Sequence, residues 1–327
     1  MRKARQFFSL VLACSSIMAV QTMSFPTGVA RIVVTSSSYY HDPPVLTADD
    51  LIVKQEYEPR PISALIPLRG ARADLELYLL VANSSNGELG PRFADLQKFL
   101  GSQPATTSIG IAYIEDGRLE VAQKPTHDHE RAIQALSPPS GGTPSNPFRP
   151  LADLIKGWNQ EASRRAVLLI SDGIDPRASG RLINESVDTT LGLAQHAGVT
   201  VYAIYHPGAD YLRTDYLTIY SGQVQLAHFT SETGGEAYFQ GPEPLPSFAP
   251  FLARIGDRLA NQYLVEFVTN PGAGGALQDV SVTSKIQDVH LSAPWKVWIS
   301  APVVLQSGAS AKKEVVNMHS RKGRQSF

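Results

Sequence analysis

The stretch Ala166-Val-Leu-Leu-Ile-Ser-Asp-Gly173 is a mostly apolar run that stops abruptly at an aspartate and a glycine. Such a pattern is typical of a buried strand followed by a tight loop. An earlier stretch, Leu79-Leu-Val-Ala-Asn-Ser-Ser-Asn86, has the same form but ends without an acidic residue. Two parallel strands ending side by side would bring Ser84, Asn86 and Asp172 to one point at the carboxyl edge of a sheet, where open α/β sheets place their sites. The two stretches therefore predict both a fold and the position of a site.

Strand-like and helix-like segments alternate between residues 75 and 262. The expected strands are Leu75–Val81, Ser108–Ile114, Arg118–Ala122, Ala166–Ser171, Thr200–Tyr205 and Glu236–Phe239. The expected helices are Arg92–Leu100, Asp128–Leu136, Pro150–Trp158, Ile183–His196, Gln223–Thr233 and Phe248–Asn261. This alternation predicts a doubly wound, Rossmann-like α/β domain over residues 75–262, with a mostly parallel sheet and helices on both faces. Asp116-Gly117 is a hairpin signal, so we expect Arg118–Ala122 to be an antiparallel edge strand.

The regions on either side of this domain favour β-structure. Residues 27–70 contain short β-like pieces such as Leu51–Glu56, and Asp42-Pro-Pro44 breaks the chain between them. Strand patterns return in residues 263–301, beginning with Tyr263–Val268. We expect the two flanking regions to pair with each other in a small β segment.

The first residues have the layout of a secretory signal peptide. A basic start is followed by the uncharged apolar run from Phe7 to Val20, which is too short for a comfortable membrane span. We predict a signal peptide over residues 1–24 and a secreted or periplasmic protein. Cys14 is the only cysteine, and we interpret it as an incidental residue of this leader. Membrane association is expected only if the leader is retained or Cys14 carries a lipid.

The charge distribution argues against a nucleic-acid partner. The chain has 327 residues and a formal net charge of −1, but the leader and residues 306–327 are both basic. The body between them is therefore acidic, unlike a nucleic-acid-binding surface. We expect the polar tail of residues 306–327 to be disordered and its charges to be solvated.

Three stretches in this order resemble the von Willebrand factor A domain. They are the strand and polar loop of residues 79–86, the loop Gly141-Gly-Thr-Pro-Ser145 before a helix, and Leu169-Ile-Ser-Asp-Gly173. The continuation of the third stretch to Pro176, together with Val201-Tyr-Ala-Ile-Tyr205, is more similar to the A-domain-related proteins of Acidobacteria. Asn261-Gln-Tyr-Leu264 and Leu46-Thr-Ala-Asp-Asp50 also fit that group. The resemblance covers about residues 28–300.

The resemblance implies a metal-ion-dependent adhesion site. In the family, an Asp-Xaa-Ser-Xaa-Ser loop, a threonine and an aspartate from three loops supply oxygen ligands to Mg²⁺, which prefers six oxygens in octahedral geometry. A carboxylate of the partner protein occupies the remaining position. Carried over by position, the first aspartate falls on Ala82, the two serines on Ser84 and Asn86, the threonine on Thr143 or Ser145, and the last aspartate on Asp172.

This sequence departs from the family pattern at the leading ligand. Ala82 puts a methyl group where the family has a carboxylate, and Asn86 replaces a small hydroxyl by an amide. Glu88 and Asp175 lie nearby in sequence and offer some charge, but we favour a pocket without metal. We therefore predict a degenerate site that binds Mg²⁺ weakly if it binds it at all, with no assured cofactor, through Ser84, Asn86, Thr143 and Asp172. Asp172 has a second interpretation, in which it simply caps the turn after its strand.

The segment Pro207–Gln223 is expected to be a surface insertion that carries tyrosines. Exposed tyrosines are common contact residues, and long loops are often functional. The alternative is that the rings pack back onto the domain. From this segment and the three loops we predict a partner-binding surface that includes Ser84, Ser145, Asp175, Tyr211 and Tyr216.

The sequence lacks a catalytic constellation that we can recognise. There is no Gly-Xaa-Ser-Xaa-Gly elbow and no phosphate-binding Gly-Lys-[Ser/Thr] loop, and His127-Asp-His129 is best interpreted as a capped helix start. We predict a non-enzymatic protein that binds an unidentified protein partner through the carboxyl edge of its sheet. Two alternatives stay open: a hydrolase-type enzyme that uses Asp172, and a purely structural envelope protein.

Overall fold

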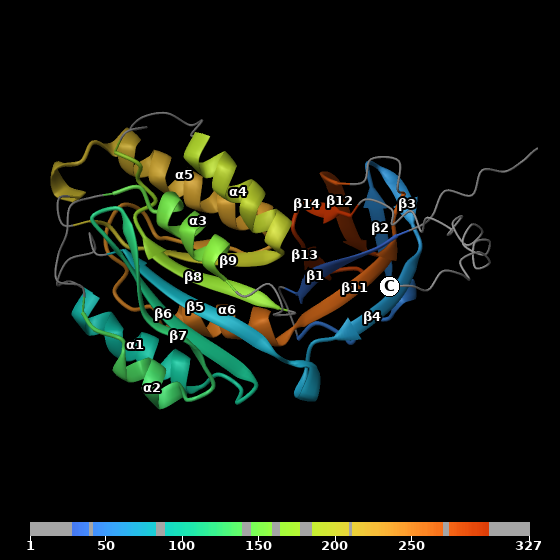
Figure 1. Ribbon diagram of the computed structural model, residues 1–327, viewed down its shortest axis with the longest axis horizontal. Helices are drawn as coiled ribbons and strands as arrows, with labels where there is room; N and C mark the ends of the chain where they lie inside the picture. Colours follow the sequence, from blue (N-terminus) through green and yellow to red (C-terminus); the bar gives the residue numbers. More distant parts are fainter. Residues whose placement is uncertain are drawn as a thin grey trace, which may run out of the picture.

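The computed structural model describes residues 28–38, 42–82, 89–138, 145–158, 164–176, 185–208, 211–270 and 275–300. An α/β domain lies at one end of the molecule and a β module, which we define as residues 28–67 and 262–300, lies at the other (Figure 1). The predicted signal peptide and basic tail lie outside the described residues. So do Ser84, Asn86, Glu88 and Thr143 of the predicted site.

A six-stranded sheet forms the centre of the α/β domain. Its strands are β5 (Leu75–Ala82), β6 (Thr107–Glu115), β7 (Arg118–Thr126), β8 (Arg165–Ser171), β9 (Val199–Tyr205) and β10 (Ala237–Tyr238). They lie in the order β10-β9-β8-β5-β6-β7, and only the edge strand β7 is antiparallel to its neighbour. The predicted fold class and the predicted edge hairpin are confirmed.

Helices cover both faces of this sheet (Figure 1). They are α1 (Gly90–Gly101), α2 (His129–Gln134), α3 (Phe148–Gly157), α4 (Glu185–Ala197), α5 (Tyr216–Glu232) and α6 (Ala249–Ala260). Successive side chains of a strand point to opposite faces, so Leu77 and Leu79 of β5 pack with α1, α2 and α6, whereas Tyr78 and Leu80 pack with α3, α4 and α5. Strands buried on both faces must be mostly apolar, which explains the near-continuous apolar runs. None of the described helices is long and apolar enough to cross a membrane.

Helix α5 begins seven residues earlier than the sequence suggested, so the expected insertion Pro207–Gln223 is wrong in extent. Asp215 starts the helix, because its carboxylate accepts hydrogen bonds from the backbone N–H of Thr218 at 3.0 Å and from its hydroxyl at 2.7 Å. A short 3-10 turn, η5 (Tyr211–Arg213), precedes it. The first two turns of α5 carry exposed tyrosines, so the apolar periodicity that marks a helix starts only further along.

The start of α2 agrees with the sequence interpretation of His127-Asp-His129. Asp128 is the N-cap, and its carboxylate accepts a hydrogen bond from the backbone N–H of Arg131 at 3.1 Å. The side chain of His129 instead contacts the backbone carbonyl of Thr107 at 2.8 Å. The two histidines therefore belong to a helix start.

The β module consists of two four-stranded antiparallel sheets, ordered β13-β1-β11-β4 and β14-β12-β2-β3. Its strands are β1 (Val29–Ser37), β2 (Leu51–Gln55), β3 (Glu58–Arg60), β4 (Ile62–Pro67), β11 (Gln262–Val268), β12 (Ala276–Ser284), β13 (His290–Ser292) and β14 (Lys296–Ile299). The 3-10 turns η1 (Ala48–Asp50) and η2 (Gly70–Arg72) lie in the N-terminal flank. Residues such as Val34, Val53 and Phe267 form a core separate from those of the α/β domain. The two flanking regions therefore do pair with each other.

Two glycines let helix α5 rest directly on the loop that follows β8. Gly173 in that loop has a φ of +70°, and a Cβ added to it would lie 2.4 Å from the carbonyl oxygen of Gly222 in α5. A Cβ added to Gly222 would lie 2.4 Å from the carbonyl oxygen of Asp172. The backbone of the loop therefore packs directly on the backbone of the helix. This contact fixes the position of Asp172 relative to the second turn of α5.

We predict that Gly222→Ala destabilises the protein by about 2–3 kcal/mol, because the added methyl group overlaps the carbonyl of Asp172 and neither backbone segment can withdraw easily. Gly157→Ala is the matched control: Gly157 also lies in a helix, but a Cβ there has no atom within 4 Å. That variant should be neutral or more stable by about 0.5–1 kcal/mol. Urea unfolding measures both free energies, and equal values for the two variants would refute the contact.

Candidate functional site

The carboxyl edge of the central sheet places Ala82 beside the loop that carries Asp172. In the parallel pair β5–β8, Val81 lies opposite Ile170, so the two strands end at the same level. The methyl group of Ala82 is 3% exposed, and the residues after it lie outside the described chain. The meeting of Ser84, Asn86 and Thr143 with Asp172 therefore stays a prediction, whereas the two strand ends do lie side by side.

Asp172 is buried and holds its own loop. Its side chain is 4% exposed, and one carboxylate oxygen accepts a hydrogen bond from the backbone N–H of Ile174 at 3.0 Å. Such a bond to the backbone two residues on is an Asx turn. Burial raises the pKa of Asp172 to about 6, although backbone hydrogen bonds act in the opposite direction. The geometry agrees with the interpretation of Asp172 as a turn cap.

Asp175 belongs to a polar cluster with Asn146 and Ser186. The amide of Asn146 donates to the carboxylate of Asp175 at 2.6 Å and to the hydroxyl of Ser186 at 2.7 Å, and the hydroxyl lies 3.3 Å from the same carboxylate. The other end of the Asn146 amide accepts from the backbone N–H of Phe148 at 2.8 Å, at the first residue of α3. The cluster therefore ties the β8–α4 loop to the beginnings of α3 and α4. Asp175 itself is 7% exposed.

Ser145 lies at the same edge of the sheet, beside the turn between β6 and β7. Its Cβ is 3.5 Å from the point where a Cβ on Gly117 would lie. The side chain is half-buried. Of the second predicted loop, the described chain thus includes Ser145 and places it near the hairpin turn, while Thr143 lies outside it.

An exposed apolar patch stands at the beginning of α5. We define the tyrosine patch as Leu212, Tyr216, Leu217 and Tyr220, which are 83%, 68%, 69% and 51% exposed. The rings of Tyr216 and Tyr220 stack on each other at 6.4 Å between centroids, as residues four apart on a helix do. These rings do not pack back onto the domain, whereas Tyr211 is half-buried. Because Gly222 contacts the Asp172 loop, the patch lies at the same end of the sheet as Asp172 (Figure 1).

The described residues do not by themselves compose a metal site. They contain no group of three or more histidine, cysteine, aspartate or glutamate side chains that could hold a metal ion. Of the predicted ligands, Asp172 lies within them, together with Ser145, the alternative to Thr143. The carboxylate of Asp172 already accepts a hydrogen bond from its own loop. Hard cations such as Mg²⁺ need several oxygen ligands. Because Ser84, Asn86 and Thr143 lie outside the described residues, the degenerate metal site stays a prediction.

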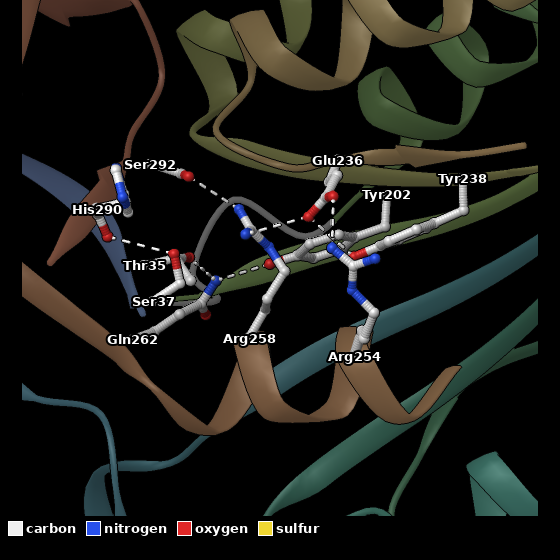
Figure 2. Close-up of polar contacts among 10 residues, drawn as sticks. All are labelled: Thr35, Ser37, Tyr202, Glu236, Tyr238, Arg254, Arg258, Gln262, His290 and Ser292. Atoms are coloured by element: carbon white, nitrogen blue, oxygen red, sulfur yellow. Dashed lines mark hydrogen bonds and ion pairs between the residues drawn. The ribbon is translucent and has the colours of Figure 1, made fainter. Parts of the chain in front are cut away.

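A polar network at the other end of the domain joins it to the β module (Figure 2). Glu236 forms ion pairs with Arg254 at 3.1 Å and with Arg258 at 3.2 Å, and Arg258 donates to the hydroxyl of Ser292 at 2.9 Å. Both arginines belong to α6, whereas Glu236 directly precedes β10 of the central sheet and Ser292 lies in β13 of the β module. The Arg258 guanidinium thus links helix α6 to the central sheet, beside β10, and to the β13-β1-β11-β4 sheet of the β module.

Gln262 extends the same network (Figure 2). Its amide donates to the hydroxyl of Thr35 at 3.1 Å and to that of Tyr202 at 3.3 Å. Burial raises the pKa of Tyr202, so its phenol stays protonated at neutral pH. Nearby, Ser37 donates to the carbonyl of His290 at 3.4 Å. The network offers neither a nucleophile paired with a base nor an open position for a substrate, and it serves to hold the two parts together.

No family model and no curated protein matches the chain. Among solved structures, the chain is similar to a von Willebrand factor type A protein from Catenulispora acidiphila, with 8% identity over 86% of this chain and 75% of that one and a TM-score of 0.42. It is also similar to an aerotolerance-related membrane protein from Bacteroides fragilis, with 13% identity, 57% and 98% coverage and a TM-score of 0.41. A third is the von Willebrand domain of a type V pilus tip protein from Porphyromonas gingivalis, with 10% identity, 56% and 94% coverage and a TM-score of 0.40. At such values none of their properties carries over to this chain.

The sequence interpretation missed His206, which directly follows β9. It is 1% exposed, its Nδ1 lies 3.0 Å from the carbonyl oxygen of Pro207, and its Nε2 has no partner among the described residues. Burial lowers its pKa to about 4, so the ring is neutral at physiological pH. It packs edge-on against Phe248 at 5.9 Å between centroids. A lone histidine at a strand end gives no sequence signal, and the same is true of Asn146 and Ser186.

The buried carboxyl group of Asp172 predicts a pH-dependent stability. Its pKa is about 6 in the folded protein, against the ordinary value of 3.8 for an aspartate. Between these pH values the folded state therefore holds a proton that the unfolded chain releases. Stability should therefore fall as the pH rises from about 4 to about 6, by on the order of 3 kcal/mol for this group.

Asp172→Asn tests this assignment, because the amide oxygen can still accept from the N–H of Ile174. Urea unfolding between pH 4 and pH 8 should show a flatter profile for the variant and a higher free energy of unfolding at pH 7. A variant that is less stable at pH 7 would mean that the charged form of Asp172 is the favoured one, as a bound cation would make it.

Proposed function

We propose that this chain is a von Willebrand A-like protein that acts outside the cytoplasm and binds a protein partner through the carboxyl edge of its central sheet. The observation that carries the proposal is the tyrosine patch, which lies at the edge where the ordered sequence motifs also end. The leader over residues 1–24 supports export. We further propose that the protein is not an enzyme.

The chemistry of the patch favours a protein partner. Contiguous exposed apolar side chains are uncommon on a soluble monomer and mark interaction sites. Tyrosine is enriched at protein interfaces because its ring buries a large area while its hydroxyl finds a hydrogen-bond partner. Stacking of Tyr216 on Tyr220 restricts both rings before binding, which lowers the entropy lost on association.

The other predicted contact residues take different places in this proposal. Tyr216 is the central contact, Tyr211 lies in the 3-10 turn before α5, and Ser145 lies at the same edge of the sheet near the β6–β7 turn. Asp175 is buried, so it supports the surface from beneath by holding the β8–α4 loop. Ser84 lies outside the described residues and is proposed as a contact on the strength of its position after β5.

We also propose that the metal site is degenerate. In a complete adhesion site the metal bridges to a carboxylate of the partner, but here Ala82 supplies a methyl group and Asp172 is occupied by its own loop. Affinity would then come from apolar contact at the tyrosine patch. The same burial argues against a hydrolase that uses Asp172, since a catalytic carboxylate must reach its substrate.

A photo-crosslinking amino acid at Leu212, in the tyrosine patch, should capture a protein in the native envelope or secreted fraction. The adduct should fall at least about tenfold when Tyr216→Ser and Leu217→Ser are added, because these two side chains carry much of the apolar contact and hot-spot losses exceed 1.4 kcal/mol.

The same crosslinker at Val45 is the matched control, since Val45 is 72% exposed but belongs to the β module. It should give no adduct that depends on Tyr216 and Leu217. A purely structural envelope protein would give no patch-dependent adduct at Leu212 either, and that result would refute the proposed function.

Restoring the missing carboxylate tests the metal part of the proposal. Isothermal titration calorimetry of the wild-type protein with Mg²⁺ and Mn²⁺ should show at most millimolar binding, and Ala82→Asp should raise the affinity at least about tenfold, because a second carboxylate adds a ligand and a charge. Tight stoichiometric binding by the wild type would contradict degeneracy. An unchanged affinity in a folded Ala82→Asp variant would contradict the convergence of the three loops.

A further inference from the structure

A cavity of about 580 Å³ lies between the β module and the end of α5, far from the tyrosine patch. Its lining includes two exposed aromatic residues, Tyr57 and Trp295, and the charged residues Lys54, Asp279 and Lys296. Ser292 of the polar network in Figure 2 also contributes to the lining, so the cavity borders the junction of the two parts.

The backbone of Trp295 is held by hydrogen bonds on both sides of the residue. Its side chain is 62% exposed, yet its backbone N–H donates to the carbonyl of Glu232 at 3.1 Å and its carbonyl accepts from the N–H of Val280 at 2.8 Å. Gly234 allows this approach: it has a φ of +80°, and a Cβ there would lie 2.9 Å from the backbone carbon of Ala293. The backbone that carries the indole is therefore held in place, while the side chain is exposed to solvent.

Tyr57 is 84% exposed and stands on an unusual turn. Glu56 and Tyr57 form the two-residue loop between β2 and β3, with φ values of +49° and +68°. Hairpin loops with two positive φ angles normally use Asn-Gly or similar pairs, so Glu-Tyr is costly here. The backbone N–H of Glu56 donates to the carbonyl of Asp279 at 2.9 Å, and the Glu56 carboxylate accepts from the N–H of Asp279 at 2.9 Å. Strain that the surroundings maintain in this way points to a function for the side chain it presents.

The charges around the cavity cancel. The lining holds two lysines, Lys54 and Lys296, and two acidic residues, Glu232 and Asp279. Lys296 lies 3.6 Å from the carboxylate of Asp279. A carboxylate beside an ammonium group offers one acceptor and one donor at neighbouring positions. Two adjacent hydroxyl groups of a ligand match that arrangement, since each hydroxyl can both donate and accept.

We propose that this cavity binds a neutral polysaccharide. Pyranose rings with equatorial hydroxyls present flat C–H faces, which fit the electron-rich faces of Trp295 and Tyr57, and a rim of hydroxyls, which fits the Asp279–Lys296 pair. An extended proline-rich peptide also binds aromatic-lined grooves. It exposes only carbonyl acceptors along its edge, however, and would add no donor to the exposed carboxylate of Asp279, which Lys296 approaches only to 3.6 Å. The site is independent of the proposed protein-binding edge.

Isothermal titration with cellohexaose and with chitohexaose tests the proposal on the full chain. At least one of the two oligosaccharides should bind, and Trp295→Ala and Tyr57→Gly should each weaken that binding at least about tenfold, which corresponds to 1.4 kcal/mol. Glycine adopts positive φ without strain, so Tyr57→Gly removes the ring and keeps the turn. Tyr216→Ala, which removes an exposed ring from the tyrosine patch, is the matched control and should leave the binding unchanged.

Three results would overturn the proposal: no binding of either oligosaccharide by the folded protein, binding that both Trp295→Ala and Tyr57→Gly leave intact, or binding of decaproline that Trp295→Ala abolishes. The last would assign the cavity to a peptide. Thermal unfolding of each variant shows that it is folded, so loss of binding is not loss of structure. Loss of crosslinking at the tyrosine patch with intact sugar binding would refute the proposed protein-binding function alone.

Discussion

The side-chain amide of Gln262 holds together three strands that are distant in the sequence. It donates to Thr35 in β1 and to Tyr202 in β9, while its own backbone begins β11. Gln262 is 1% exposed, and a buried amide needs hydrogen-bond partners. An arrangement of the three strands that separates Gln262 from Thr35 and Tyr202 would leave this amide unpaired, so the contact restricts how the strands can be arranged. Helix α6 ends at Ala260, two residues before Gln262. This contact and the Arg258–Glu236 ion pair therefore set how the β module is oriented on the central sheet. The cavity beside Trp295 exists only in that arrangement.

The secondary structure could be predicted where burial imposes a pattern. Strands β5, β8 and β9 are buried on both faces, and their near-continuous apolar runs mark them in the sequence. The first two turns of α5 could not be predicted in the same way, because Tyr216, Leu217 and Tyr220 face solvent and interrupt the apolar periodicity. The flanking regions could be seen to favour strands. Their division into two sheets depends on pairings such as Val33 with Leu264, which no local pattern encodes.

The candidate site also has parts that the sequence predicts and parts that only the folded structure shows. The positions of Ala82 and Asp172 follow from the ends of two parallel strands, so the sequence was sufficient to place them next to each other. The cluster of Asn146, Asp175 and Ser186 joins residues from separate loops, and their spacing carries no signal. Asp172 is buried and its carboxylate accepts a hydrogen bond from its own loop, and burial depends on the whole fold and not on the local sequence. For this reason the sequence left two interpretations of that residue, and its geometry within the described chain favours the turn cap.

Both described ends of the chain lie in the β module, with β1 beginning at Val29 and β14 ending at Ile299 (Figure 1). A mechanical pull between these two points is carried by the antiparallel strands of the module, and the central sheet of the α/β domain stays outside the load path. A pull between the tyrosine patch and either end instead passes through the Gln262 and Arg258 contacts. The junction between the two parts is therefore the element that bears tension when the molecule is held at one end and loaded at the other.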